Sequence, residues 1–225
     1  MELSNRTVEI LRNFSTINPN IVVNGGNVLK TMSIAKNIVS RAEIDESFPN
    51  TFGIYDLSEF LSVLTLVDRP SITFGESFCT VSDGSGLSSV KYFYSDPEML
   101  SAPMKDIVMP EGEVKFLLTN ETLSKIKRAS SALGYDNISI RPNGNSIEIN
   151  VVDANDSTSN SYSVLTEGSF PEGTDFNFIM GVGNMKLLGG DYEVSVSTKL
   201  ISHFKSTDSD TQYFIALEKS STYGA

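Results

Sequence analysis

The sequence is poor in the side chains from which proteins build redox, metal and nucleophilic centres. It has one cysteine, Cys79, which excludes an internal disulfide and a cysteine metal cluster and predicts a reducing compartment. Its one histidine, His203, follows Ile201 in a strand pattern, and no nucleophile signature lies beside it. A packing or surface role for His203 is therefore favoured over a role as a metal ligand or general base.

Long apolar segments and complete nucleotide-binding motifs are also missing. The sequence has no run of about 18 apolar residues, and its N-terminus has no basic segment leading into an apolar one, so we expect neither a spanning helix nor a signal peptide. Residues 25–31 end like a phosphate loop but lack a glycine directly before Lys30, and residues 181–183 hold only part of a dinucleotide fingerprint. We therefore expect no catalytic residues, no metal and no cofactor.

The composition is that of a folded but acidic protein. Its 225 residues are 40% hydrophobic and 20% charged, which allows one large domain or two of ordinary size. The formal net charge is −11. This charge argues against a protein that coats nucleic acid over its whole surface, but it is compatible with cations gathered on a single face.

One segment, residues 119–134, has the opposite charge balance. Its pattern predicts a complete helix, because a threonine or an asparagine can cap its start and Gly134 can supply a left-handed stop. The apolar side chains share one face, Arg128 points nearly opposite to them, and Lys125 and Lys127 lie at the flanks. Taken alone, the segment is explained well by an ordinary solvated surface helix.

A second segment, residues 4–17, repeats this arrangement. Arg12 lies opposite its apolar face, and Arg6 lies at the flank. Each helix is followed by a segment with an Asn-Gly step, residues 20–29 and 137–149, that predicts a hairpin. Arg12 and Arg128 lie 116 residues apart, and the two hairpin segments start 117 residues apart. A basic helix that occurs twice favours a functional role for its cations, and the chain reads as a duplication of one helix-and-sheet unit.

The repeat predicts two domains, residues 1–95 and 112–225, joined by an interdomain crossover at residues 96–111 that is apolar but interrupted by prolines. The first domain has a second predicted helix at residues 55–67. Residues 176–190 occupy the matching place in the second domain, and we expect a short helix there. Alternating apolar segments predict antiparallel strands elsewhere, so the predicted fold class is α+β, with two helices on antiparallel sheets in each domain.

Several segments, spread in order along the whole chain, resemble a known family. They are residues 11–18 (Leu-Arg-Asn-Phe-Ser-Thr-Ile-Asn), 54–61, 176–179, 184–186 and 216–222. In sequence, order and spacing they resemble the DNA polymerase sliding clamp, or processivity factor, of T-even-type bacteriophages. The chain departs from that family mainly in residues 75–115 and 150–170. The resemblance implies the DNA-clamp fold and a homotrimer closed into a ring.

The family resemblance also implies what the protein does. It implies a ring that encircles double-stranded DNA without reading its sequence and tethers the replicative DNA polymerase for processive synthesis. An ATP-driven clamp loader would open the ring, and phage late transcription factors would use the same clamp in the cytoplasm of the infected bacterial host. Such a protein would be no enzyme, would need no cofactor and would have no membrane partner.

Three sets of residues are the candidates for these contacts. The DNA-facing residues would be Arg6, Arg12, Lys125, Lys127, Arg128 and Lys186. The partner-peptide pocket would consist of Met104, Ile107, Val108, Met109, Tyr213, Ile215 and Ala216, although plain core packing explains each of them singly as well. The subunit interface would include Lys91, Tyr92, Tyr94, Tyr162 and Val164, because a closed ring must hide its sheet edges.

Two other classes of function remain open at this point. A non-catalytic β-rich interaction or virion protein without a DNA role fits the acidic composition and the lack of a catalytic motif, but it leaves the matching arginines unexplained. It predicts no stimulation of the cognate polymerase. A hydrolase with a site scattered along the sequence has no positive support, and an unbiased substrate screen would test it.

Overall fold

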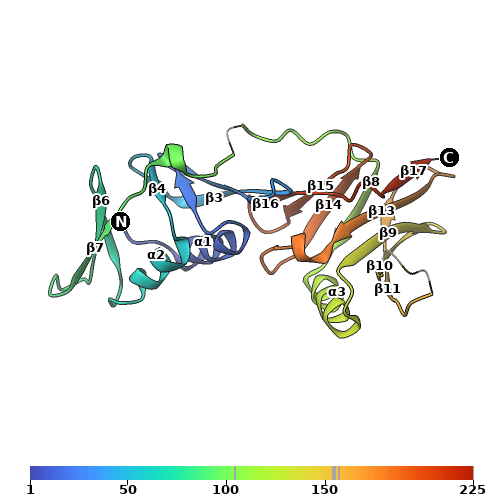
Figure 1. The fold of residues 1–225 in the computed structure, drawn as a ribbon, viewed down its shortest axis with the longest axis horizontal. Helices are drawn as coiled ribbons and strands as arrows, with labels where there is room; N and C mark the ends of the chain where they lie inside the picture. The colour runs from blue at the N-terminus through green and yellow to red at the C-terminus, as the bar shows by residue number, and fades with distance from the viewer. Residues whose placement is uncertain (104, 154–155, 157, 225) are drawn as a thin grey trace. The chain divides into compact units, whose positions relative to one another are not determined.

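The structure is a computed structural model that describes residues 1–103, 105–153, 156 and 158–224. The chain forms two compact units, Met1–Asp106 and Ile107–Ala225, which run from blue to green and from green to red in Figure 1. Each unit combines α-helix with antiparallel strands. Among the described residues, none of the helices has both the length and the apolar character that a membrane crossing needs.

The first unit begins with α1, Asn5–Ile17. Ser4 caps this helix, because its Oγ accepts a hydrogen bond from the Thr7 N–H at 3.2 Å. The apolar positions recur at helical spacing, and the buried side chains are Thr7, Ile10, Leu11, Phe14 and Ile17. The helix predicted over residues 4–17 is therefore confirmed.

The second helix, α2, spans Leu57–Leu64 and is shorter than the predicted 55–67. Asp56 caps it by accepting a hydrogen bond from the Glu59 N–H at 2.9 Å. At the other end the Thr65 N–H donates to the Ser62 carbonyl at 3.0 Å, which is the tighter bond of a 3₁₀ turn. This tighter turn ends the helix before residue 67.

The strands of the first unit are β1 (Ile21–Val23), β2 (Gly26–Met32), β3 (Ile38–Phe48), β4 (Phe52–Ile54), β5 (Ser71–Phe74), β6 (Phe78–Ser82) and β7 (Ser89–Phe93). β1 pairs with β4, β2 pairs with β3, and β5, β6 and β7 form one antiparallel sheet. The hairpin predicted over residues 20–29 is therefore wrong, because β1 and β2 have different partners. Gly26, with φ of 108°, lets the chain change direction between them. Cys79 of β6 is fully buried, and the 3₁₀ helix η1 (Pro97–Met99) follows β7.

The second unit has one α-helix in its described residues, α3 (Asn120–Leu133), capped by Thr119 and ended by Gly134 with φ of 73°. Its strands are β8 (Val114–Leu118), β9 (Asn137–Asn143), β10 (Ser146–Val152), β11 (Tyr162–Thr166), β12 (Gly168–Ser169), β13 (Asp175–Gly181), β14 (Tyr192–Ser197), β15 (Ile201–Ser206), β16 (Gln212–Ala216) and β17 (Thr222–Gly224). One sheet runs in the order β12, β8, β14, β15, β16, and the other in the order β11, β10, β9, β13, β17. The predicted hairpin at residues 137–149 is confirmed by β9 and β10.

The short helix predicted over residues 176–190 is wrong. Residues 175–181 form β13, and only the 3₁₀ turn η2 (Val182–Asn184) follows. Phe176, Phe178 and Met180 are buried at alternate positions, which is the period of a strand. β13 also pairs with β9, from Phe178 opposite Ile140 to Gly181 opposite Asn137. Pairing with the sheet outweighs the weak local tendency to form a helix.

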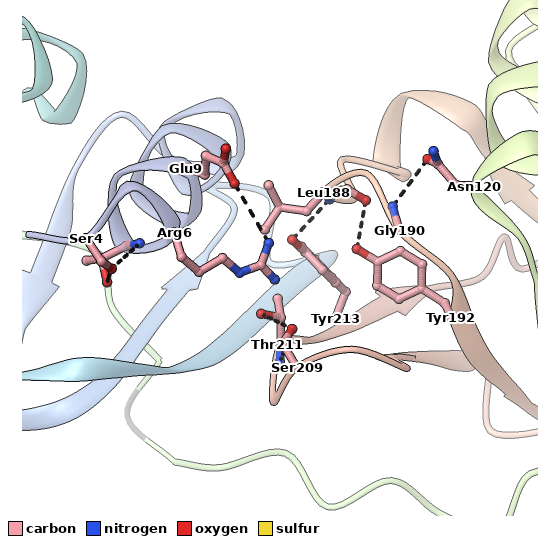
Figure 2. A network of polar contacts seen from close by, with 11 residues as sticks. Ser4, Arg6, Glu9, Asn120, Leu188, Gly190, Tyr192, Ser209, Thr211 and Tyr213 are labelled. Atoms are coloured by element: carbon pink, nitrogen blue, oxygen red, sulfur yellow. Dashed lines mark hydrogen bonds and ion pairs between the residues drawn. The ribbon is translucent and has the colours of Figure 1, made fainter.

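Two tyrosines fix the segment after η2 to the core of the second unit (Figure 2). The Tyr213 hydroxyl accepts a hydrogen bond from the Leu188 N–H at 3.2 Å, and the Tyr192 hydroxyl donates to the Leu188 carbonyl at 2.8 Å. The rings of Tyr192 and Tyr213 pack edge to face, with 6.0 Å between their centroids. Both polar groups of Leu188 are thereby satisfied, so this irregular segment can lie against a packed core.

Candidate nucleic-acid interface and partner surfaces

α1 presents two arginines to solvent. Arg12 lies two residues from both Ile10 and Phe14, which rotates it about 160° away from each of these buried side chains. Arg6 and Arg12 are both exposed, and Arg6 Nη1 lies 4.0 Å from Glu9 Oε2 (Figure 2). An exposed ion pair of this length contributes little to stability.

α3 carries the second group of cations. Lys125 Nζ lies 2.6 Å from Glu121 Oε1, one turn away. This hydrogen-bonded ion pair raises the pKa of Lys125 and lowers the pKa of Glu121. Lys127 and Arg128 are exposed on the same helix. With Glu121 already paired, the remaining charge on the solvent side of α3 is positive, which suits an anionic ligand.

Lys186 has a different setting from the one that its sequence suggested. It follows η2 and is half-buried between the buried residues Met185 and Leu187, and its N–H donates to the Asn184 carbonyl at 2.8 Å. It therefore does not lie on the exposed face of a regular helix. Of the four predicted DNA-facing residues of the second unit, three lie on α3. Lys186 lies on the separate segment that follows η2.

The predicted partner-peptide pocket divides into exposed and buried residues. Val108 is 87% exposed, and Ile107, Met109 and Ala216 are half-buried. Tyr213 and Ile215 are 0% exposed, so their side chains belong to the core and do not line a surface. The physical reason is strand alternation, which turns Phe214 and Ala216 to the opposite face of β16. Met104 lies outside the described residues.

That opposite face of the sheet holds a trough of about 600 Å³ that the sequence did not reveal. Alternate residues of β8, β14 and β15 line it, namely Lys115, Leu117, Glu193, Ser195, His203 and Lys205. The His203 ring stacks on Phe214 at 4.6 Å, and its Nε2 lies 3.0 Å from Gln212 Oε1. Burial lowers the pKa of His203, so it is a neutral packing residue near pH 7. The alternation of residues along each strand can be read from the sequence. The order of the strands in the sheet, which brings these residues together in the trough, cannot.

The predicted interface residues lie on two strands that end their sheets among the described residues. Lys91 and Tyr92 belong to β7 and Tyr94 follows it, while Tyr162 and Val164 belong to β11. A strand at the end of a sheet has backbone N–H and C=O groups without a ladder partner. Contact between subunits at these strands stays a prediction.

The described residues contain no group of three or more His, Cys, Asp or Glu side chains that could hold a metal ion.

Comparison with solved structures defines the class of fold. The chain superposes on the proliferating cell nuclear antigen of Thermococcus kodakaraensis with a TM-score of 0.70 and 13% identity, covering 95% of this chain and 96% of that one. The PCNA2–PCNA3 complex of Sulfolobus tokodaii gives a TM-score of 0.70 at 14% identity, covering 94% and 95% of the two chains. The fold is therefore the DNA-clamp fold, as predicted.

Comparison of sequences narrows the class to one family. The family model "gp45 sliding clamp, C terminal" matches residues 115–219, and "DNA polymerase processivity factor" matches residues 4–77. The sliding clamp of Vibrio phage KVP40 is 31% identical over 223 residues, covering 97% of this chain and 99% of that protein. The sliding clamps of Escherichia phage RB69 and Enterobacteria phage T4 are each 30% identical over 99% of both chains. The chain belongs to the phage sliding clamp family, which favours a replication clamp over an interaction or virion protein without a DNA role.

Proposed function

We propose that this chain assembles as a homotrimer that closes into a ring around double-stranded DNA and tethers the replicative DNA polymerase. The observation that carries the proposal is the positive charge on the exposed sides of α1 and α3, in a chain whose net charge is −11. Arginine and lysine contact phosphates without reading bases, so binding would be independent of sequence and sensitive to salt. Weak contacts suit this task, because a closed ring is retained by its topology and must still slide.

The test reverses one arginine on each helix. The Arg12→Glu, Arg128→Glu double variant should retain the mass of the wild-type assembly but give shorter products in primer extension with the cognate polymerase and clamp loader. Each lost phosphate contact should also lower the slope of log affinity against log salt by about 0.9. A matched control is Lys36→Glu, Lys219→Glu, which makes one equal charge change in each unit at exposed positions. Product lengths equal to those of the control would contradict the assignment of the inner face.

The polymerase would bind through a short apolar peptide at the exposed side of Ile107, Val108, Met109 and Ala216. Tyr213 and Ile215 would then lie beneath this surface in the core. The trough lies on the face of the sheet that carries Phe214 and Ala216, opposite the core. Mixed apolar and polar lining of this kind suits a peptide with a few anchoring side chains.

The remaining parts of the function follow from the ring. A closed ring must be opened to admit DNA, so a clamp loader that hydrolyses its own ATP would act on it. Phage late transcription factors would use the same clamp. The protein itself would catalyse no reaction and would work in the cytoplasm of the infected bacterial host.

A further inference from the structure

The interdomain crossover is tied to the first unit at two places near the end of β2. Asn18, which is fully buried, donates from Nδ2 to the Met32 carbonyl at 2.7 Å and to the Ser101 carbonyl at 3.4 Å. Farther along the crossover, Asp106 Oδ1 lies 2.6 Å from Lys30 Nζ. A buried amide therefore holds the start of the crossover, and an ion pair holds its middle.

The ion pair lies directly before the residues that are the candidates for peptide docking. Asp106 precedes residues 107–109, which we call the docking segment, and its Val108 side chain is 87% exposed. On the far side of the docking segment, the Glu111 carbonyl accepts a hydrogen bond from Ser197 Oγ at 2.9 Å. The docking segment is thus a short span between two anchors, and loss of either anchor would let it sample more conformations.

The charges around Lys30 explain why it needs a carboxylate from the crossover. Lys30 of β2 lies directly opposite Arg41 of β3, and like charges at opposite positions of a strand pair destabilise it. Arg41 pairs with Glu43 of its own strand, whereas Lys30 pairs with Asp106. The hydrogen bond from Lys30 is the main cause that lowers the pKa of Asp106, and the charge of Arg41 lowers it further. The two cations therefore favour the position of the crossover that brings Asp106 to them.

We propose that the Lys30–Asp106 ion pair holds the docking segment in the conformation that receives the polymerase peptide, so that Lys30 is a positioning residue for partner binding. This inference rests on the docking surface proposed above. A segment that is ordered before the peptide arrives loses less conformational entropy on binding, which raises the affinity. The Asp106 side chain is 68% exposed, so salt would screen the pair and lower the affinity although the docking segment itself is apolar.

The first experiment measures the mobility of the docking segment without a peptide. A nitroxide is attached to Val108→Cys in the full-length chain, where the natural Cys79 is fully buried and does not compete. Lys30→Gln and Asp106→Asn should each narrow the spectral lines, and added salt should do so in the wild-type background, whereas Lys30→Arg should keep them broad. Lys36→Gln, which removes the same charge at the exposed turn between β2 and β3, is the control.

The second experiment measures binding of a labelled peptide from the polymerase C-terminus by fluorescence anisotropy, without the nitroxide. Lys30→Gln and Asp106→Asn should each weaken binding by about threefold to tenfold, the effect of ordering one or two more side chains. The double variant should lose no more than either single variant, because both remove the same pair. Lys36→Gln and Glu111→Gln make matching charge changes at exposed sites and should bind like the wild type.

The outcomes separate this inference from the docking surface on which it rests. A wild type that does not bind the peptide would overturn the docking surface. Wild-type binding that Lys30→Gln and Asp106→Asn leave unchanged would overturn the positioning role and leave the docking surface standing. Tighter binding by Asp106→Asn would also overturn it, because Asp106 and the peptide would then compete for Lys30. Nitroxide spectra that Lys30→Gln does not alter would show that the ion pair does not hold the segment.

Discussion

Replacement of Glu46 tests how the first unit holds α1, the helix that carries Arg12. Glu46 of β3 accepts hydrogen bonds from the Ser4 N–H and from the Thr7 hydroxyl, the latter at 2.5 Å. A carboxylate at the start of the helix satisfies donor groups there and favours the positive end of the helix dipole. Thr7 is buried, so its hydroxyl would lose this acceptor in a place that water does not easily reach.

The expected loss can be estimated from these two bonds. A hydrogen bond to a charged group contributes about 1.5–3 kcal/mol, and such contributions are not fully additive. Glu46→Ala should therefore lower the free energy of unfolding by about 2–4 kcal/mol, measured by urea denaturation at pH 7. Asp45→Ala, an exposed neighbour on the same strand, should change it by less than about 0.5 kcal/mol. Equal effects of the two variants would refute the proposed role of Glu46.

The same carboxylate predicts a dependence on pH. Burial raises the pKa of Glu46, but hydrogen bonds from Ser4 and Thr7 outweigh it, so the pKa lies below its ordinary value of 4.5. A carboxyl with a lowered pKa stabilises the folded state above its unfolded pKa, and this contribution is lost as pH falls through the folded pKa. The stability difference between wild type and Glu46→Gln should be complete near pH 7 and shrink below about pH 4. A difference that stays constant through this range would contradict the assigned cause.

Two further predictions concern the second unit. Val108→Glu should weaken binding of a peptide from the polymerase C-terminus by at least about tenfold, measured by fluorescence anisotropy, because the bound peptide would bury an unpaired charge. Ile34→Glu, at another exposed apolar site, is the control and should not weaken binding. Gly168→Ala should lower thermal stability by about 1–3 kcal/mol, because its Cβ would meet Ile147 Cδ1 and a backbone carbonyl of β8. Gly84→Ala, where a Cβ meets nothing within 4 Å, is the control, and equal effects of the two alanines would show that β12 does not pack as described.

The helices of this protein could be predicted well because their signals are local. Thr119 caps α3 with its Oγ 3.1 Å from the Thr122 N–H, and Gly134 ends it in the left-handed conformation, as their residue types suggest. The exposure of Arg12 and Arg128 followed from helical spacing and is confirmed. Their contact with DNA stays a prediction, because it depends on the assembly and not on the helix alone.

The errors came from features that depend on distant parts of the chain. β13 is a strand because β9 pairs with it, which no local pattern in residues 176–190 shows. The Asn-Gly step after β1 resembles a hairpin turn, yet β1 pairs with β4 from Ile21 opposite Ile54. For the pocket, Tyr213, Ile215 and Ala216 all lie on one strand, β16. Which of its alternating residues face the core depends on what packs against each face of the sheet. In the structure Tyr213 and Ile215 face the core.

The burial of Cys79 gives this protein a built-in probe of its own motion. The thiol lies inside the sheet of β5, β6 and β7, and burial raises its pKa, so the reactive thiolate is scarce in the folded state. A thiol reagent can reach it only when that sheet opens. The rate at which a thiol reagent labels this single cysteine therefore reports how often the sheet of β5, β6 and β7 opens, without an engineered label.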